Sequence, residues 1–491
     1  MKRANSGIDY NPAPTQRRRI ETVADFVKDG GEAEREIRER LRKLSATRGE
    51  HELWTYFDKD QKVAFGVTFD LLDLDTYKSL RRRMLASEAR KKAANEIAKV
   101  NNANAMEAFV SGAAKTGSLV VMFMNIGSGD CIFIQTPKGK TIVIDCGQRA
   151  TPTNRKRYAK EIKDMLASEL FLNKQKQLFA LILTHPDQDH YKEVVNIIGK
   201  SNISIRHLFF TMAKGDYAAN KTFETLDKAT VINRIAINDL GISIENNFVG
   251  NKIDKYYERG ISKLQILGNK AGMDGWNEDN CSIHLLAAGV PPTHNETEAN
   301  AASIVTLIQA FNRKILLCGD STLSTEEFVI DKHADLLADI DLAQMEHHGS
   351  GTEHAGVKYV GKINPIVAVA SSGPHEGDKN PRWSTIARYA DPAETMANRT
   401  GLHRLTKTLD AHEIKYSVNE EWTPRNANEW KNKYPKYGIF TTESNGDLCF
   451  EIDKNGNIIR EFNQSKKRHI YTIPRNGPVT AEEKDIPGGT S

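Results

Sequence analysis

From Gly117 onward the chain alternates short apolar runs with turn signals and amphipathic stretches, and this alternation restricts the fold more than any other feature. The stretch CIFIQTPKGKTIVIDCG predicts two strands joined at Pro137-Lys138-Gly139, and an amphipathic helix around Tyr158 and Ile162 precedes the strand LFALILT. The later runs ASIVTLIQAF, KILLCGD, DIDLAQM and PIVAVASS have the length of buried strands, with room between them for crossover helices. A layered α/β domain is therefore expected.

With 491 residues, 39% of them hydrophobic, the chain is too long for one ordinary domain and too apolar for general disorder. We predict a charged, mainly helical N-terminal region over residues 1–116, an α/β domain over 117–462, and a flexible C-terminal tail over 463–491. The α/β domain is expected to close with a hairpin in DLCFEIDKNGNIIREF that turns at Asn455-Gly456.

The mild positive charge of the chain belongs to its N-terminal region. Residues 1–115 carry 23 Lys+Arg and 18 Asp+Glu, a net charge of +5. The rest of the chain carries −1, which gives +4 for the whole chain. Helices of this kind usually present a solvated face, although a protein partner could dock on them. No apolar run is long enough to cross a bilayer, and the five dispersed cysteines suit reduced core thiols. The sequence therefore predicts a cytoplasmic protein without a membrane partner.

The strongest chemical signal is the heptapeptide THPDQDH, which directly follows an apolar strand and directly precedes YKEVVNII, a predicted amphipathic helix. His185, Asp187, Asp189 and His190 put four potential metal ligands into six consecutive positions. Because α/β sheets gather ligands at the carboxyl ends of their strands, this density favours metal binding. Residues two apart on an extended loop point the same way, so His185 and Asp187 are expected to face one cation, and Asp189 and His190 a second.

Two cations need a bridging anion and ligands from other parts of the chain. Asp320 ends the run KILLCGD, and His347 and His348 close another apolar run before Gly349-Ser350. Each of these positions alone would be an ordinary turn residue. Their common placement after strands makes them candidate metal ligands.

The motifs NIGSGD, LILTHPDQDH, NAASIVTLI, ILLCGD and MEHHGS, in this order over about residues 118–452, resemble the metallo-β-lactamase superfamily, and most of all the hydrolase domain of ComEC-type DNA-uptake proteins. The resemblance implies an αββα sandwich with a two-metal site at one edge. It implies that Asp320 bridges both metals, and that His347 or His348 completes the second. The family's third-motif ligand falls at Asn300 to Ser303, where the ComEC branch also lacks the usual histidine.

The turn after the first strand carries glycines that allow close backbone approach, and Asp130 and Asp145 are candidates for orienting the ligating imidazoles. Two departures from the ComEC pattern stand out. The turn begins with Asn125 instead of Asp, and Asn380-Pro381 replaces a His-Pro pair, with His375 nearby.

The resemblance and the ligand set predict a hydrolase in which two divalent metal ions, Mn²⁺ or Zn²⁺, make hydroxide available at neutral pH. Asp189, His190, Asp320 and His348 are the predicted catalytic residues. Because carboxylates are hard ligands, a phosphodiesterase or nuclease acting on DNA or nucleotides is the leading hypothesis. Hydrolysis of a small ester, lactone or lactam remains an alternative, as does a non-catalytic, metal-stabilised interaction protein in a multi-protein bacterial system.

Overall fold

The computed structural model describes a defined part of the chain: residues 23–29, 31–46, 74–75, 77–82, 84–85, 117–149, 152–167, 172, 176–199, 203–228, 231–236, 257–258, 263–267, 280–351, 354–373, 380–390, 414–417, 430–433, 438–464 and 467–485. The chain divides into two compact units, residues 1–96 and 97–491. The predicted boundary at residue 116 lies in a stretch outside the described residues.

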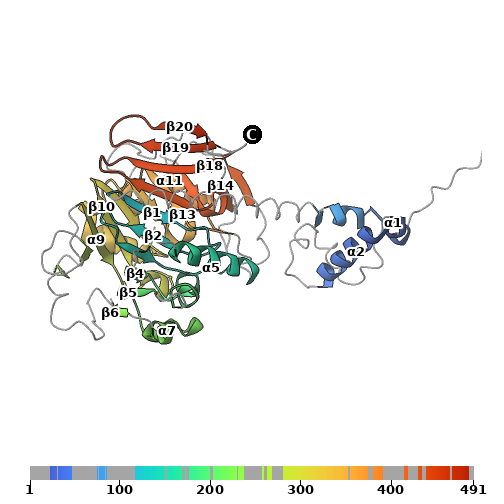
Figure 1. Ribbon diagram of the computed structural model, residues 1–491, viewed down its shortest axis with the longest axis horizontal. Helices are drawn as coiled ribbons and strands as arrows, with labels where there is room; N and C mark the ends of the chain where they lie inside the picture. The colour runs from blue at the N-terminus through green and yellow to red at the C-terminus, as the bar shows by residue number, and fades with distance from the viewer. Residues whose placement is uncertain are drawn as a thin grey trace, which may run out of the picture. The chain divides into compact units, whose positions relative to one another are not determined.

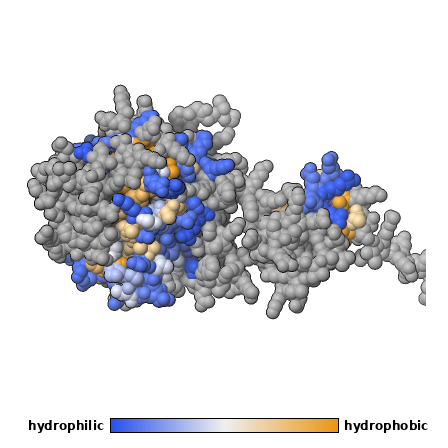
Figure 2. Space-filling view, turned by 90° about the horizontal axis from the view of Figure 1, so that it is seen from below, coloured by the Kyte–Doolittle hydropathy of each residue, from blue (hydrophilic) through white to orange (hydrophobic). Residues whose placement is uncertain are grey.

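The N-terminal unit contains α1 (Val23–Asp29), α2 (Gly31–Ala46) and helical residues between 74 and 85. Its small core includes Leu41, Tyr77 and Leu80. Glu34 ties the segments together, because it accepts hydrogen bonds from the Tyr77 hydroxyl and from Arg81 Nε at 3.0 and 2.8 Å. Figure 2 shows that the described residues of this unit are mainly hydrophilic on the face in view, with a few apolar residues among them.

The second unit is built on two large sheets. The first sheet has the strand order β20-β19-β18-β17-β1-β2-β3-β4-β5-β6. Its strands are β1 (Leu119–Phe123), β2 (Ile132–Gln135), β3 (Thr141–Ile144), β4 (Gln177–Leu183), β5 (Ser204–Phe210), β6 (Val231–Ala236), β17 (Leu448–Ile452), β18 (Ile458–Gln464), β19 (Lys467–Ile473) and β20 (Thr480–Asp485). Strands β3 to β6 run parallel, and the other neighbours run antiparallel.

The second sheet has the order β16-β13-β12-β11-β10-β9-β8-β7. Its strands are β7 (Tyr257–Glu258), β8 (Lys263–Leu267), β9 (Cys281–Ala287), β10 (Val305–Ala310), β11 (Arg313–Leu317), β12 (Leu342–Gln344), β13 (Val367–Ala370) and β16 (Ile439–Thr441). A separate small ribbon pairs β14 (Ile414–Ser417) with β15 (Trp430–Lys433). The four strands β11, β12, β13 and β16 run parallel, so their carboxyl ends meet at one edge.

Apolar side chains fill the space between the two sheets and cover both outer faces. The central cluster joins Val121 and Ile134 of the first sheet to Ile308 and Val369 of the second. A second cluster packs the outer face of the first sheet against α5 (Pro152–Ala167) and α7 (Thr222–Lys228), and a third packs the second sheet against α9 (Leu323–Leu337), α10 (Val357–Ile363) and α11 (Trp383–Ala390). The second unit is thus a helix–sheet–sheet–helix sandwich, as Figure 1 shows.

Two sequence predictions need correction. Residues 463–491, predicted as a flexible tail, contain the antiparallel strands β19 and β20. Pro474 and Pro478 lie in the turn between them, and Lys467 pairs in register with Asp485, so the charged and proline-rich composition belongs to a hairpin. The single helix predicted in YKEVVNII is instead the end of α6 (Gln188–Tyr191) followed by a π-helical turn at Val195–Gly199.

Among the described residues, no helix combines the length and the apolar character that crossing a bilayer requires. The five cysteines are buried thiols that form no disulfide, as predicted for core thiols.

Candidate metal centre

The predicted site residues follow strands of both sheets at the edge where the parallel strands end. Asp145 follows β3, and the segment Thr184–His190 follows β4. Asp320 follows β11, His347 and His348 lie in a 3₁₀ turn after β12, and Ser371 follows β13. The sequence predicted that candidate ligands would gather at the carboxyl ends of strands, and these residues do lie at such ends.

The ligand-rich segment after β4 is a helix start. Asp187 is extended, with φ −76° and ψ 142°, and caps α6, so Asp189 and His190 lie in its first turn. The backbone amide of His190 donates to the Asp187 carbonyl at 2.9 Å. The segment is therefore a helical turn and not the extended loop from which the two pairs were predicted, and His190 lies within reach of ligand atoms on both sides.

The Asp320 carboxylate lies at the centre of the cluster, and it is almost fully buried. Its Oδ2 atom lies 3.6 Å from His185 Nε2 and 3.4 Å from His347 Nε2. Its Oδ1 atom lies 3.1 Å from His190 Nε2 and 3.5 Å from His348 Nε2. One carboxylate thus faces two pairs of imidazoles, each pair on a different oxygen.

The two remaining aspartates extend these halves. Asp187 Oδ2 lies 3.8 Å from His185 Nε2, on the side of Asp320 Oδ2. Asp189 Oδ2 lies 3.5 Å from His348 Nε2, on the side of Oδ1. The sets His185, His190 and Asp320, and Asp189, His190 and His348, each bring ligand atoms within 4.8 Å of one another, so each could hold a cation.

Each of the four imidazoles uses its Nδ1 atom for a contact on the far side of the ring from Asp320. The partners are Asp145 Oδ2 for His190 (2.8 Å), the Ser371 carbonyl for His348 (2.8 Å), His354 Nε2 for His347 (2.7 Å) and Thr184 Oγ1 for His185 (3.1 Å). In a neutral ring whose Nδ1 donates, the Nε2 lone pair faces the centre of the cluster. Metal-binding histidines are held by outer partners in this way.

The atoms that face the centre lack hydrogen-bond partners although they are buried. They are Nε2 of His185, His190 and His348, and both carboxylate oxygens of Asp320. A buried polar atom left unsatisfied costs about 1–3 kcal/mol, and more if charged. These residues fit divalent cations, because coordination would satisfy all of these atoms together.

The electrostatic state of the cluster follows from its mixed charges. Burial alone would raise the pKa of Asp320, but the imidazoles of His190, His347 and His348 hold that pKa well below its usual range. Burial lowers the pKa of His348, yet the carboxylates of Asp320 and Asp130 outweigh it and raise this pKa to about 9. Imidazole protons therefore neutralise part of the negative charge of the carboxylates, and bound cations could neutralise it instead.

Asp130 and Asp145 lie behind the imidazoles. Asp145 accepts hydrogen bonds from the Thr184 amide and hydroxyl at 2.8 and 2.6 Å, in addition to its contact with His190. Asp130 accepts from Gln344 Nε2 at 2.8 Å, and its Oδ1 lies 3.8 Å from His348 Nδ1. Asp145 is therefore placed to orient the His190 ring, whereas Asp130 lies near the rings of His348 and His190 without a hydrogen bond to either.

The third-motif residues are placed differently from metal ligands. Ser303 Oγ lies 3.4 Å from His185 Nδ1, which is the side of the ring turned away from Asp320. Asn300 lies in the short helix α8 (Glu298–Ala301), and its side-chain oxygen is buried without a hydrogen-bond partner. His375 lies outside the described residues, while Asn380 donates to the His347 carbonyl at 3.3 Å.

Sequence reasoning missed two residues of the site. Arg149 Nη2 lies 2.9 Å from Asp189 Oδ1 and 3.6 Å from Asp187 Oδ2, and about a third of its side chain is exposed (35%). His354 is buried behind His347. The available signals were the position of Arg149 four residues after Asp145 and a third histidine soon after His347-His348, but neither spacing belongs to a known ligand pattern.

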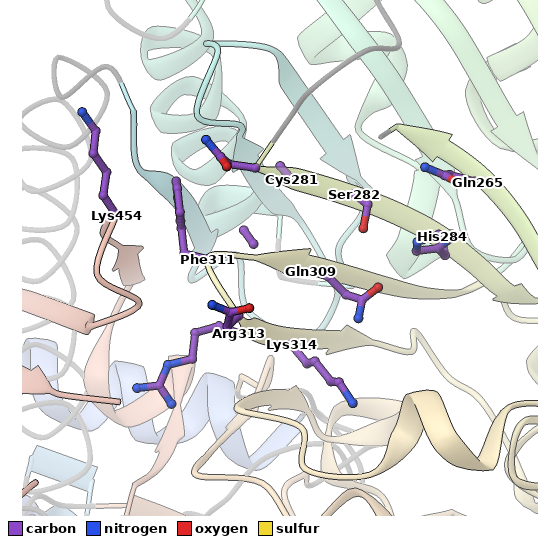
Figure 3. Close-up of a pocket in the computed structure, with 12 residues that line it drawn as sticks. Gln265, Cys281, Ser282, His284, Gln309, Phe311, Arg313, Lys314 and Lys454 are labelled. Atoms are coloured by element: carbon purple, nitrogen blue, oxygen red, sulfur yellow. The ribbon is translucent and has the colours of Figure 1, made fainter. Parts of the chain in front are cut away.

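The hollow drawn in Figure 3, of about 760 Å³, is separate from this cluster. It is lined by Gln309, Lys314, Lys454 and neighbouring residues around the turn between β10 and β11, at the opposite end of β11 from Asp320. Figure 3 shows these side chains spread over several elements without converging on one point. None of the predicted site residues lines it.

No family model matches the chain. The chain is 24% identical to the ComE operon protein 3 of Bacillus subtilis (strain 168) over 275 residues, which are 54% of this chain and 30% of that protein. Human tRNase Z, short form, superposes with a TM-score of 0.31 and 10% identity, covering 52% of this chain and 93% of the other. Zn²⁺-bound PqqB from Methylobacterium extorquens gives 0.26 and 11%, covering 48% and 78%.

The two facing sheets, the helices on both outer faces and the cluster of His and Asp at their edge have the arrangement of the metallo-β-lactamase fold. The order of its motifs and its similarity to the ComE operon protein 3 make the chain ComEC-like, and it spans less than a third of the length of that protein.

Proposed function

We propose that this protein is a metal-dependent phosphodiesterase that acts on DNA or nucleotides and binds two divalent cations, Mn²⁺ or Zn²⁺. The observation that carries the proposal is the ring of buried, unpartnered Nε2 and carboxylate oxygen atoms around Asp320. The first cation would be held by His185, Asp187 and Asp320, and the second by Asp189, His190, Asp320 and His348.

Two such cations, when bound, supply a water of lowered pKa and neutralise charge that develops on a phosphoryl group. The residues of this chain contribute the geometry. Asp320 presents one oxygen to each half of the cluster, which keeps the two halves adjacent. Asp145 and Ser371 fix the rings of His190 and His348 through Nδ1, so that the ligand atoms are in place before a cation arrives.

Two features favour an anionic, phosphate-containing substrate. Three carboxylates in the cluster, from Asp187, Asp189 and Asp320, make a hard ligand set that suits Mn²⁺. Arg149 lies against Asp187 and Asp189 and is partly exposed, and a guanidinium in this position can donate to a phosphate oxygen. We therefore include Arg149 as a substrate-binding residue. The docking of a protein partner on residues 1–116 and a cytoplasmic location stay predictions.

The test uses the full chain, freed of metal by chelation and supplied with Mn²⁺. We expect cleavage of single-stranded DNA and of bis(p-nitrophenyl) phosphate, and loss of both activities in Asp189→Ala and His190→Ala, because each removes a ligand of the second cation. Asp331→Ala is the matched control, since Asp331 is an exposed carboxylate on α9 paired with Lys332.

Unchanged activity in both ligand variants, with circular dichroism showing an intact fold, would contradict the proposed site. Turnover of a neutral ester or lactone without phosphodiester cleavage would instead support the small-ester hydrolase alternative. An absence of both activities in a protein that binds two cations would support a non-catalytic, metal-stabilised role.

A further inference from the structure

We propose that His347 is a ligand of the first cation and replaces the third-motif ligand that this chain lacks, while His348 serves the second cation and His354 positions His347. The inference rests on the proposed function, because it requires the two cations.

The two neighbouring histidines approach different oxygens of the same carboxylate. His347 Nε2 lies 3.4 Å from Asp320 Oδ2, the oxygen that also faces His185. His348 Nε2 lies 3.5 Å from Asp320 Oδ1 and 3.5 Å from Asp189 Oδ2. The pair therefore does not offer two alternative ligands for one cation, because each ring lies in its own half of the cluster.

The backbone makes this division possible. His347 and His348 both have left-handed conformations, with φ of 44° and 57°. Such a conformation costs a non-glycine residue on the order of 1 kcal/mol or more and is found mainly where function holds it. It turns two consecutive side chains toward one carboxylate, with ring centroids 5.8 Å apart. The Asn380 side chain, which replaces the histidine of the family's pair, holds the His347 carbonyl at 3.3 Å.

A relay of hydrogen bonds fixes the tautomer of His347. The Ser321 carbonyl can only accept, so the His354 Nδ1 atom, 2.8 Å away, donates to it. His354 Nε2 then carries a lone pair and accepts from His347 Nδ1 at 2.7 Å. His347 Nε2 is left with its lone pair on the side of Asp320 Oδ2. His354 is thus a positioning residue that makes His347 a ligand.

The first half of the cluster gains a protein donor from His347. Without His347 it offers His185, Asp187 and one oxygen of Asp320, since Ser303 lies behind His185. Three protein donors and a water suffice for a catalytic zinc ion, and His347 raises the number of protein donors to four, which suits a metal that takes more ligands, such as Mn²⁺. His347 is also partly exposed, at 26%, whereas the His348 side chain is 3% exposed, so the first cation would lie nearer to solvent.

The experiment measures the number of Mn²⁺ ions bound by the full chain, using calorimetry, elemental analysis and electron paramagnetic resonance. The unaltered protein should bind two ions with a spin-coupled spectrum. His347→Ala and His348→Ala should each bind one ion with an uncoupled, six-line spectrum. His294→Ala, which alters an exposed histidine on the surface, is the matched control and should still bind two.

Double variants identify which ion each histidine holds. Because Asp187 belongs to the first half, His347→Ala with Asp187→Ala should still bind one ion, whereas His348→Ala with Asp187→Ala should bind none. His354→Gln should weaken one of the two ions about 10- to 100-fold without abolishing it, and this variant tests the relay should His347→Ala fail to fold.

The outcomes separate the two proposals. An unaltered protein that binds no Mn²⁺ would overturn the proposed function. Two ions in the unaltered protein and still two in His347→Ala, or the reverse result for the double variants, would overturn the present inference alone. If His354→Gln binds each of the two ions as tightly as the unaltered protein does, His354 does not position His347.

Discussion

The two ends of β11 place buried charges in opposite situations. At its start, Arg313 Nη1 lies 2.8 Å from Asp341 Oδ1, and Arg313 Nε donates to the Gly456 carbonyl at 2.6 Å. The second oxygen of Asp341 accepts from the Lys314 amide at 2.8 Å. Beyond its end, Asp320 and the imidazoles around it leave their inward-facing atoms without hydrogen-bond partners.

This contrast distinguishes a structural ion pair from a binding site. Both groups of charges are buried, so burial and unusual charge alone would not tell them apart. The start of β11 satisfies its charges within the protein and can stabilise only the fold. The cluster beyond its end has oriented every ring from behind and still lacks partners in front, which is the arrangement expected of residues that bind something else.

The largest expected effect comes from removing Asp341, the carboxylate of the ion pair at the start of β11. Asp341→Ala leaves the Arg313 guanidinium buried without its carboxylate, so we expect a loss of about 3–5 kcal/mol in the free energy of unfolding, measured by urea denaturation. The number of bound Mn²⁺ ions should stay at two. Asp320→Asn should instead lose Mn²⁺ binding and keep its free energy of unfolding. A common loss of ions and stability in Asp341→Ala would argue against two independent networks.

An intermediate effect is expected where the backbone supports the metal centre. A Cβ atom on Gly147 would lie 2.4 Å from the backbone nitrogen of His190 and 2.4 Å from the carbonyl carbon of Asp189. Gly147→Ala should therefore displace both side chains and weaken Mn²⁺ binding about 10- to 100-fold by calorimetry. Gly215→Ala is the control, because a Cβ there meets no atom within 4 Å and its backbone is not left-handed. Equal Mn²⁺ affinity in both variants would contradict this.

A third situation is a buried carboxyl whose hydrogen-bond donor is the Asn125 amide. Burial raises the pKa of Asp447 to about 8, although the Asn125 amide favours the anion. Because the folded protein then holds a proton that the unfolded chain releases near pH 4, stability should fall as the pH rises from about 4 to 8.

Asp447→Asn should flatten this pH dependence, measured by urea denaturation at a series of pH values, and should raise stability at the alkaline end. The exposed Asp331→Asn should leave the slope as it was. A slope that is the same in Asp447→Asn and the unaltered protein would show that another group titrates in this range.

The sequence predicted the parts of the site that depend on local pattern. The apolar runs gave the strands, and the rule that ligands gather at strand ends linked His185 to Asp320 and His348 across the chain. The αββα class followed from the motif resemblance. The structure agrees because buried strands and their ends are encoded over a few adjacent residues.

The remaining features depend on contacts between distant residues. The division of His347 and His348 between two oxygens follows from left-handed backbone angles that no sequence pattern specifies at histidine. The partner of Asp130 is Gln344, which lies on the other sheet. The strands β19 and β20 were read as a tail because their pairing stabilises a polar composition that would not form strands in isolation.

Strand β20 is the outermost described strand of the first sheet, so one of its edges has no neighbour among the described strands. An open edge of this kind can recruit a further chain and start uncontrolled aggregation. Here the edge carries the sequence TAEEKD, and a second copy would have to bring Glu482, Glu483 and Asp485 against its own acidic side chains. Repulsion between like charges would disfavour the addition of a second copy. The first sheet can therefore end at β20 without extending into fibres.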